Sequence, residues 1–299
     1  MARRSSLLHQ LLLACWVRGA RGALQPVALR PAVLYVDPCN GDGLVEVSAY
    51  TSAVEECGAT VIPMWSAAMA ARMTDAEKGD GVYCAPAAGE ELAWASEHLD
   101  GLSLKAVLCG SDGGLACAER LQHVLLPARS NGIDAGRRDK FSANEQLRSN
   151  GLPIARQAAP ASWEAAKEFL EQLQQEQAAA GVGELRAVLK PRRGTASKGV
   201  FVARSLGAAR DQFGVLSRSH VCIDTSEVDS DSRVVVQELL DGDEWIVDSV
   251  SRDGEHKIVA LWRYDKGPAN GAPFVYFCAE LMAGSGEAES ALMDYAMGA

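Results

Sequence analysis

Short apolar runs alternate with longer amphipathic segments through the first half of the chain. The runs are rich in Val, Leu and Ala and too short for helices, which is typical of buried strands. The runs expected to form strands are residues 32–36, 59–63, 81–84 and 104–109. The segments between them are long enough for helices, one ending near Cys57-Gly58 and one near His123. This alternation predicts an α/β domain over residues 31–128, built on a parallel sheet.

The second half changes its pattern. A helix is expected over residues 139–149, and Ser162 is a candidate N-cap for another, with apolar side chains recurring at helical spacing after it. We expect this second helix to fray from Gln174 and to end at Gly181 or Gly183.

Strands are expected to follow these helices. One is the run 187–190, and the segment 233–248 is typical of a strand, a short turn and a strand. The Asp253-Gly254 turn predicts a hairpin that joins residues 245–250 to 257–262.

A loop of small residues directly follows the strand that carries Lys190. Gly194 and Gly199 bracket Thr195, Ala196 and Ser197, so the backbone N–H groups can approach an anion without hindrance. The next residues are Val200-Phe201 rather than Lys-Ser or Lys-Thr, so the loop is not a Walker A motif. It suits a nucleotide triphosphate; the alternative is an ordinary hairpin loop with a surface lysine.

Three ordered segments resemble the ATP-grasp superfamily, and specifically its carboxylate–amine ligases. The matching segments are Arg137-Arg138-Asp139-Lys140 with Gly151-Leu152-Pro153 after it, Lys190-Pro191 with the loop 194–200, and Gln237-Glu238-Leu239-Leu240 followed by Gly242-Asp243-Glu244. The resemblance implies an N-terminal α/β domain of the pre-ATP-grasp kind over 31–128, followed by an ATP-grasp α+β domain over 136–299. Residues 1–30 would be a leader or targeting segment.

The resemblance also implies roles in binding ATP. The residues concerned are Lys140 and Lys190 for the phosphates, Gly194, Thr195, Ser197 and Gly199 for the phosphate loop, Gln237 and the backbone of Glu238 and Leu240 for adenine, and Glu244 for the ribose. Two lysines and loop amides offset the charge of a triphosphate, and a carboxylate suits paired hydroxyls. The alternatives are a solvated strand end for Gln237 and Glu244, and a helix-start lysine for Lys140.

The magnesium ligands of the family are not visible in the sequence. The resemblance predicts magnesium bound by a Glu and a Glu-x-Asn pair, but after Glu280 the chain offers only Glu287, Glu289 and Asp294. We therefore expect an incomplete ATP-grasp domain and assign no metal ligand. The chain is either a fragment of a ligase or a non-catalytic ATP-binding module.

The implied reaction is ATP-dependent joining of a carboxylate to an amine through an acyl phosphate. The segment from Trp262 to Pro273 resembles amino-acid ligases more than biotin-dependent carboxylases, so the expected substrate is an amino acid or small carboxylate. A structural α/β domain without a ligand would require the three matching segments to be coincidental.

The amino-acid composition limits the classes of protein to which the chain can belong. The 299 residues are 48% hydrophobic and 23% charged, with a net charge of −10, which fits a globular chain of about two domains. No basic run indicates a nucleic-acid partner. The eight cysteines show no Cys-x-x-Cys or zinc spacing, which favours core thiols in a reducing compartment.

The first thirty residues contain five arginines and no acid. Their apolar run, 7–17, is too short to span a bilayer. We expect an organellar transit segment or a plain leader, with an organellar or cytoplasmic location ahead of secretion.

Overall fold

The computed structural model describes residues 16–18, 24–26, 29–38, 48–74, 78, 81–194, 197–218 and 234–299. The chain divides into two compact units, Met1–Asp134 and Ala135–Ala299. Most of the leader 1–30 and the whole segment 219–233 lie outside the described residues; a short two-stranded ribbon, β1 (Trp16–Arg18) with β2 (Leu24–Pro26), is described.

The first unit contains a four-stranded parallel sheet, as the sequence predicts. Its strands are β3 (Arg30–Val36), β4 (Thr60–Trp65), β5 (Tyr83–Cys84) and β6 (Leu102–Cys109), in the order β5-β4-β3-β6. The central strand β3 is buried over almost its whole length, which explains its continuous apolar run.

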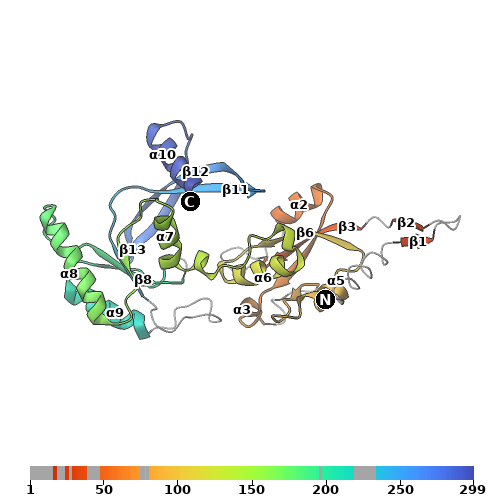
Figure 1. Ribbon diagram of the computed structural model, residues 1–299, viewed down its shortest axis with the longest axis horizontal. Helices are drawn as coiled ribbons and strands as arrows, with labels where there is room; N and C mark the ends of the chain where they lie inside the picture. Colours follow the sequence, from red (N-terminus) through yellow and green to blue (C-terminus); the bar gives the residue numbers. More distant parts are fainter. Residues whose placement is uncertain are drawn as a thin grey trace, which may run out of the picture. The chain divides into compact units, whose positions relative to one another are not determined.

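Helices pack on this sheet (Figure 1). They are α2 (Ser48–Glu56), α3 (Ala67–Ala70), α5 (Glu91–His98) and α6 (Leu115–Leu125), with single-turn helices at Asp112–Gly114 and Pro127–Arg129. Helix α2 contacts β4, and α6 contacts β6 and β3. Helix α5 was not expected; it begins beside Glu91, a buried carboxylate paired with Arg120 of α6.

Asp37 links the ends of three strands of this unit by hydrogen bonds. It follows β3 directly, is fully buried, and has a φ of 48°. Its carboxylate accepts from the Ser66 N–H at 2.7 Å, the Ser66 hydroxyl at 2.8 Å and the Ser111 hydroxyl at 2.7 Å. Ser66 follows β4 and Ser111 follows β6, so one side chain holds three strand ends in place.

The second unit begins with a single-turn helix, Ala135–Arg138, and α7 (Lys140–Ser149). It then forms an antiparallel sheet in the order β7-β10-β8-β9. The strands are β7 (Gln157–Ala158), β8 (Ala187–Pro191), β9 (Phe201–Ala203) and β10 (Val234–Glu238). Helices α8 (Trp163–Ala179) and α9 (Leu206–Arg218) contact each other and cover this sheet (Figure 1).

Helix α8 begins at the predicted N-cap and ends before Gly181, as predicted, but its last turns do not fray. The Ser162 hydroxyl accepts from the Ala165 N–H, which confirms the N-cap. The expected fraying from Gln174 is wrong, because the helix continues to Ala179. Gln177 is buried, donates to the Arg186 carbonyl at 2.9 Å and accepts from the Arg186 N–H at 2.9 Å. This exchange holds the last turn against the chain entering β8.

A second antiparallel sheet has the order β11-β12-β13. Its strands are β11 (Glu244–Arg252), β12 (Glu255–Ala269) and β13 (Ala272–Leu281), and α10 (Glu287–Gly298) contacts β11 and β12. The predicted hairpin is confirmed, with Val250 opposite Lys257 across the Asp253-Gly254 turn. The Tyr295 hydroxyl of α10 donates to the Pro153 carbonyl at 2.9 Å.

No helix among the described residues is long and apolar enough to cross a membrane. Within the same residues, Cys57, Cys84, Cys109, Cys117 and Cys278 are free thiols.

Replacing Asp37 with alanine should destabilise the first unit by about 1–3 kcal/mol, because buried Ser66 and Ser111 donors lose their acceptor. Urea unfolding of the full chain measures this. Glu97, an exposed acidic residue of α5, provides the control Glu97→Ala. Equal effects of the two substitutions, within about 0.5 kcal/mol, would contradict the role of Asp37.

Candidate functional site

A cavity of about 450 Å³ opens in the second unit. This volume lies within the range of about 300–1,000 Å³ that small-molecule sites occupy. The structure brings these predicted residues together in its lining: Lys140, Lys190, Gly194, Ser197, Gln237, Glu238, Leu240 and Glu244. Gly199 ends the loop but is not in the lining, and Thr195 lies outside the described residues.

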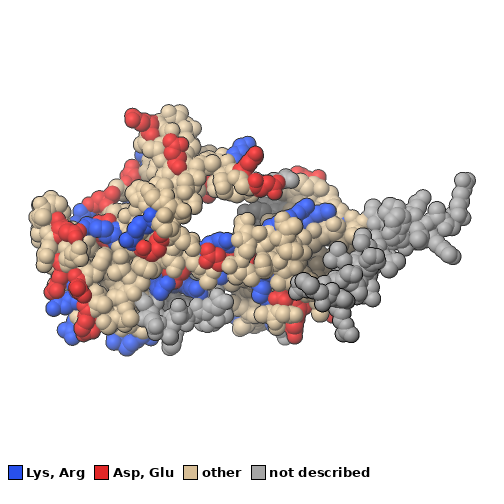
Figure 2. Space-filling view, viewed as in Figure 1, with Lys and Arg blue, Asp and Glu red and all other residues tan. Residues whose placement is uncertain are grey.

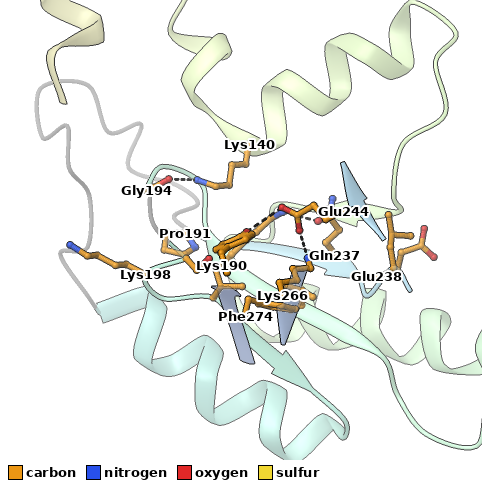
Figure 3. Close-up of a pocket in the computed structure, with 15 residues that line it drawn as sticks. Lys140, Lys190, Pro191, Gly194, Lys198, Gln237, Glu238, Glu244, Lys266 and Phe274 are labelled. Atoms are coloured by element: carbon orange, nitrogen blue, oxygen red, sulfur yellow. Dashed lines mark hydrogen bonds and ion pairs between the residues drawn. The ribbon is translucent and has the colours of Figure 1, made fainter. Parts of the chain in front are cut away.

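Lys140 reaches the cavity because a capped helix begins at that residue. Asp139 accepts from the N–H groups of Phe141 and Ser142 at 3.0 and 2.9 Å, which fixes the first turn of α7. The Lys140 ammonium then donates to the Gly194 carbonyl at 2.5 Å (Figure 3). The Asp139 carboxylate also pairs with Arg192 at 2.7 Å. These contacts hold the helix start beside the glycine loop.

The loop needs glycine at both of its ends. Gly194 has a φ of 153° and Gly199 a φ of 72°, values that side-chain-bearing residues rarely adopt. A Cβ atom on Gly199 would lie 3.0 Å from Cγ of Pro191 and 3.3 Å from Cδ2 of Leu216. The glycines therefore allow the chain to turn back tightly over the end of β8.

Lys190 and Gln237 lie on neighbouring strands and on the same face of the sheet. Lys190 is opposite Val235, and Gln237 is two residues further along β10, so the two side chains meet diagonally. The Lys190 ammonium donates to Oε1 of Gln237 at 2.7 Å. Burial, and then the charge of Lys140, lowers the pKa of Lys190 to about 8. The cavity therefore holds two lysines whose charges repel each other.

The end of β10 offers backbone groups to the cavity. Backbone groups of successive residues in a strand point to opposite edges. The Leu239 N–H donates to the Arg186 carbonyl at 3.0 Å on one edge, and the Glu238 N–H donates to the Arg156 carbonyl at 2.9 Å on the other. The carbonyl of Glu238 and the N–H of Leu240 share the second edge. An acceptor and a donor thus stand side by side at the cavity.

Lys266 of β12 also lies in the lining, and the sequence reasoning missed it. It forms an ion pair with Glu244, and its ammonium lies 5.1 Å from the centre of the Phe274 ring. Glu244 also accepts from the Tyr276 hydroxyl at 3.2 Å. Burial and then the Glu244 charge raise the pKa of Tyr276, while a hydrogen bond with Ser197 acts in the opposite direction. Lys266 is opposite Tyr276 in the sheet, a register that no local motif reveals.

Two of the lining residues direct their side chains elsewhere. Figure 3 shows the Glu238 carboxylate turned away from Lys140 and Lys190, and the Lys198 ammonium extended away from the same two lysines. Glu238 instead pairs with Arg156 at 2.7 Å. Only the backbone of Glu238 is therefore available to a ligand in the cavity, as the sequence reasoning had assigned it.

Charge of both signs is interspersed over the face of the described residues seen in Figure 2. The positive charge of the cavity is therefore a local feature of Lys140, Lys190 and Lys266 rather than part of a broad basic surface.

Within the residues that the structure describes, no group of three His, Cys, Asp or Glu side chains could hold a metal ion. Two of the four acidic residues that the sequence left as candidates already have partners. Glu280 pairs with Arg263 at 2.8 Å, and Glu289 accepts from the Gly286 N–H at 2.7 Å at the start of α10. The described carboxylates therefore do not fit a magnesium site.

No family model matches the chain. A curated relative, dapdiamide A synthase of Enterobacter agglomerans, is 28% identical over 179 residues, which are 59% of this chain and 39% of that protein. The chain thus spans well under half the length of this relative.

Solved structures of similar fold cover most of the chain. An ADP complex of the N5-carboxyaminoimidazole ribonucleotide synthetase PurK superposes with a TM-score of 0.55 at 15% identity, over 91% of this chain and 63% of that chain. An L-amino acid ligase of Bacillus licheniformis gives a TM-score of 0.56 at 15% identity, over 91% and 59%. A biotin carboxylase of Campylobacter jejuni gives 0.56 at 15%, again over 91% and 59%.

The chain therefore has the ATP-grasp fold. The predicted fold class, an α/β unit on a parallel sheet followed by an ATP-grasp unit with antiparallel sheets, is confirmed. In this fold the cavity lies among β8, β10 and the sheet β11-β12-β13, so both antiparallel sheets contribute to its walls.

The low pKa of Lys190 predicts a pH dependence for the binding of any polyanion in this cavity. Below pH 8 Lys190 is protonated with or without the ligand, so binding takes up no proton there. Above pH 8 the free lysine is neutral and the ligand must restore its proton, so affinity should fall by up to about tenfold per pH unit. Titration with magnesium-free ATP from pH 7.5 to 9.5 measures this fall.

Lys190→Arg is the control, because a guanidinium stays charged throughout this range. Its affinity should stay level between pH 8 and 9.5. An equal fall in the wild type and in Lys190→Arg would assign the titration to another group.

Proposed function

We propose that this chain binds ATP in the cavity and carries the ATP-binding part of a carboxylate–amine ligase. One observation supports this most strongly. Three lysines from separate elements, a glycine loop and the end of β10 line one cavity. A polyanion joined to a flat, hydrogen-bonding ring matches this lining, and ATP is such a molecule.

The phosphates would bind at Lys140, Lys190 and the glycine loop. Among the described lining residues, Glu244 is the acidic side chain that faces these lysines, so three positive charges and one negative charge leave an excess of about two. A triphosphate with about four negative charges relieves the repulsion between the lysines and restores the proton of Lys190.

Adenine would bind at the end of β10. The Leu240 N–H suits ring nitrogen N1, and the Glu238 carbonyl suits the exocyclic amino group. The amide oxygen of Gln237 has two lone pairs and already accepts from Lys190 at 2.7 Å, so its second lone pair can accept from the amino group. The base and the phosphates would therefore be linked through Gln237 and Lys190.

The ribose hydroxyls would bind to Glu244. The two oxygens of this carboxylate contact Lys266 and Tyr276. Hydroxyls that take over the Lys266 contact would leave its ammonium free to face the phosphates. Recognition of the sugar would then also increase the positive charge around the phosphate chain.

The reaction would proceed in two transfers. A substrate carboxylate oxygen attacks the γ-phosphorus of ATP, and ADP leaves with the electrons of the broken P–O bond. An amine then attacks the acyl carbon, and inorganic phosphate leaves as an amide forms. The contribution of Lys140 and Lys190 is to hold the phosphates and to stabilise their charge. No step is assigned to magnesium, because the described carboxylates do not fit it.

The substrate class is an amino acid or a small carboxylate. Two similar proteins support this, because one is named dapdiamide A synthase and another an L-amino acid ligase.

A second candidate function is a non-catalytic ATP-binding module. The partners of Glu280 and Glu289 favour it, because neither carboxylate is available to a metal between the β- and γ-phosphates.

Replacing Lys190 with alanine should weaken ATP binding by about 1.5–3 kcal/mol, the scale of a charge-assisted hydrogen bond. Isothermal titration of the full chain at pH 7 measures the loss. The control is Lys167→Ala, which removes an exposed lysine of α8 that pairs only with Glu171 among the described contacts. Equal ATP affinity in wild type and Lys190→Ala would remove Lys190 from the site.

Magnesium should change the ATP affinity of the 299-residue chain by less than about threefold, since water and phosphate oxygens would supply its ligands. ADP formation with mixtures of amino acids should stay at background. A coupled assay for ADP, with and without magnesium, tests both expectations. Robust ADP formation stimulated by amino acids would show that Glu280, Glu287 or Glu289 serves as a metal ligand.

A further inference from the structure

Strand β7 pairs with β10 over only two residue pairs, Val236 with Ala158 and Gln237 with Gln157. The next pair would join Glu238 to Arg156. Half of it forms, because the Glu238 N–H donates to the Arg156 carbonyl at 2.9 Å. The other half is replaced: the Arg156 N–H donates to Oε1 of the Glu238 side chain at 2.7 Å, and not to the Glu238 carbonyl.

The Glu238 carboxylate is held in this position from both sides. Its second oxygen, Oε2, accepts from Nε of Arg156 at 2.8 Å and from Nη2 at 2.7 Å. The remaining nitrogen of the guanidinium, Nη1, pairs with Glu176 of α8. Glu176 in turn accepts from Gln172 at 3.0 Å. A side chain fixed by a backbone N–H and a bidentate guanidinium has little freedom to leave the Arg156 N–H.

The bond from the Arg156 N–H to the Glu238 carboxylate affects the open strand edge. In a regular antiparallel pair the Arg156 N–H would donate to the Glu238 carbonyl and occupy it. Because the carboxylate takes that N–H, the carbonyl keeps its lone pairs for a ligand. The Leu240 N–H lies next along the same edge, beyond the end of β7.

We propose that Glu238 is a positioning residue for nucleobase recognition, whose carboxylate occupies the Arg156 N–H and so keeps the Glu238 carbonyl open to an exocyclic amino group. This inference rests on the proposed function, since it specifies how the adenine end of the cavity is kept open. The selectivity of the site for a 6-aminopurine would then depend on the Glu238 side chain, although this side chain points away from the base.

The test compares two nucleotides that differ only at this amino group. ATP carries it, and purine riboside 5′-triphosphate has hydrogen in its place but keeps ring nitrogen N1. The wild-type chain should prefer ATP by about 25-fold, the scale of two hydrogen bonds, one to the Glu238 carbonyl and one to Gln237. In Glu238→Ala the Arg156 N–H is free to bond the carbonyl. The preference should then fall to about fivefold, the part that Gln237 retains, through weaker ATP binding.

Two further variants separate positioning from stability. Glu238→Gln keeps an acceptor oxygen for the Arg156 N–H and should retain the preference. Glu176→Ala removes the other contact of Arg156 but leaves Glu238 in place, and it should also retain the preference. If Glu238→Ala does not fold, Glu238→Leu repeats the test with the methylene packing retained.

The outcomes are distinct. A lower melting temperature with an unchanged nucleotide preference in Glu238→Ala would mean that the residue is only structural, and would overturn the inference. A wild type that binds both nucleotides equally would overturn it as well, while leaving ATP binding intact. A wild type that binds neither nucleotide would remove the proposed function and this inference together.

Discussion

Repulsion between lysines enclosed in one cavity is the constraint on which the site depends. Lys190 shows it directly, because burial and the charge of Lys140 lower its pKa to about 8. Each lysine is held by an acceptor from the cavity itself: a loop carbonyl for Lys140, Gln237 for Lys190 and Glu244 for Lys266. The neutral acceptors of Lys140 and Lys190 keep both lysines facing inward without neutralising them, while the Glu244 carboxylate offsets the charge of Lys266. Enclosing like charges raises the electrostatic free energy of the protein, and a bound polyanion lowers it. This is the physical argument for a phosphate site.

The lysines meet because several secondary-structure elements begin or end close together around the cavity: α7 begins there, and β8 and β10 end there. Asp139 starts α7 so that Lys140 faces the loop, and the glycines turn the chain over the end of β8. The register of β8 with β10 places Lys190 beside Gln237. At the far end of the cavity, β7 stops after two residue pairs and leaves a strand edge open. The site thus needs strand register as much as it needs the residues of the motifs.

Local motifs in the sequence predicted the parallel sheet, the helix that begins at Lys140, the hairpin at Asp253-Gly254 and the residues that meet around the cavity. They did not reveal Lys266 or Arg156, because each acts through a partner that is distant in sequence: Lys266 through Glu244 and Arg156 through Glu238. Such contacts depend on which strands pair and in what register. The fraying expected from Gln174 was wrong for a similar reason, since Gln177 bonds the backbone of Arg186 rather than solvent. The helix propensities of the individual residues do not reveal this contact.

Hydrogen–deuterium exchange of the wild-type chain with and without ATP tests the central claim most directly, because it reads the backbone at both ends of the cavity at once. The account predicts slower exchange in peptides that cover residues 187–203 and 236–245 when ATP is added, with α8 and the parallel sheet of the first unit unchanged. ATP that slows exchange in neither segment, or that slows it equally throughout the chain, would contradict the claim that these lysines and this strand edge form the nucleotide site.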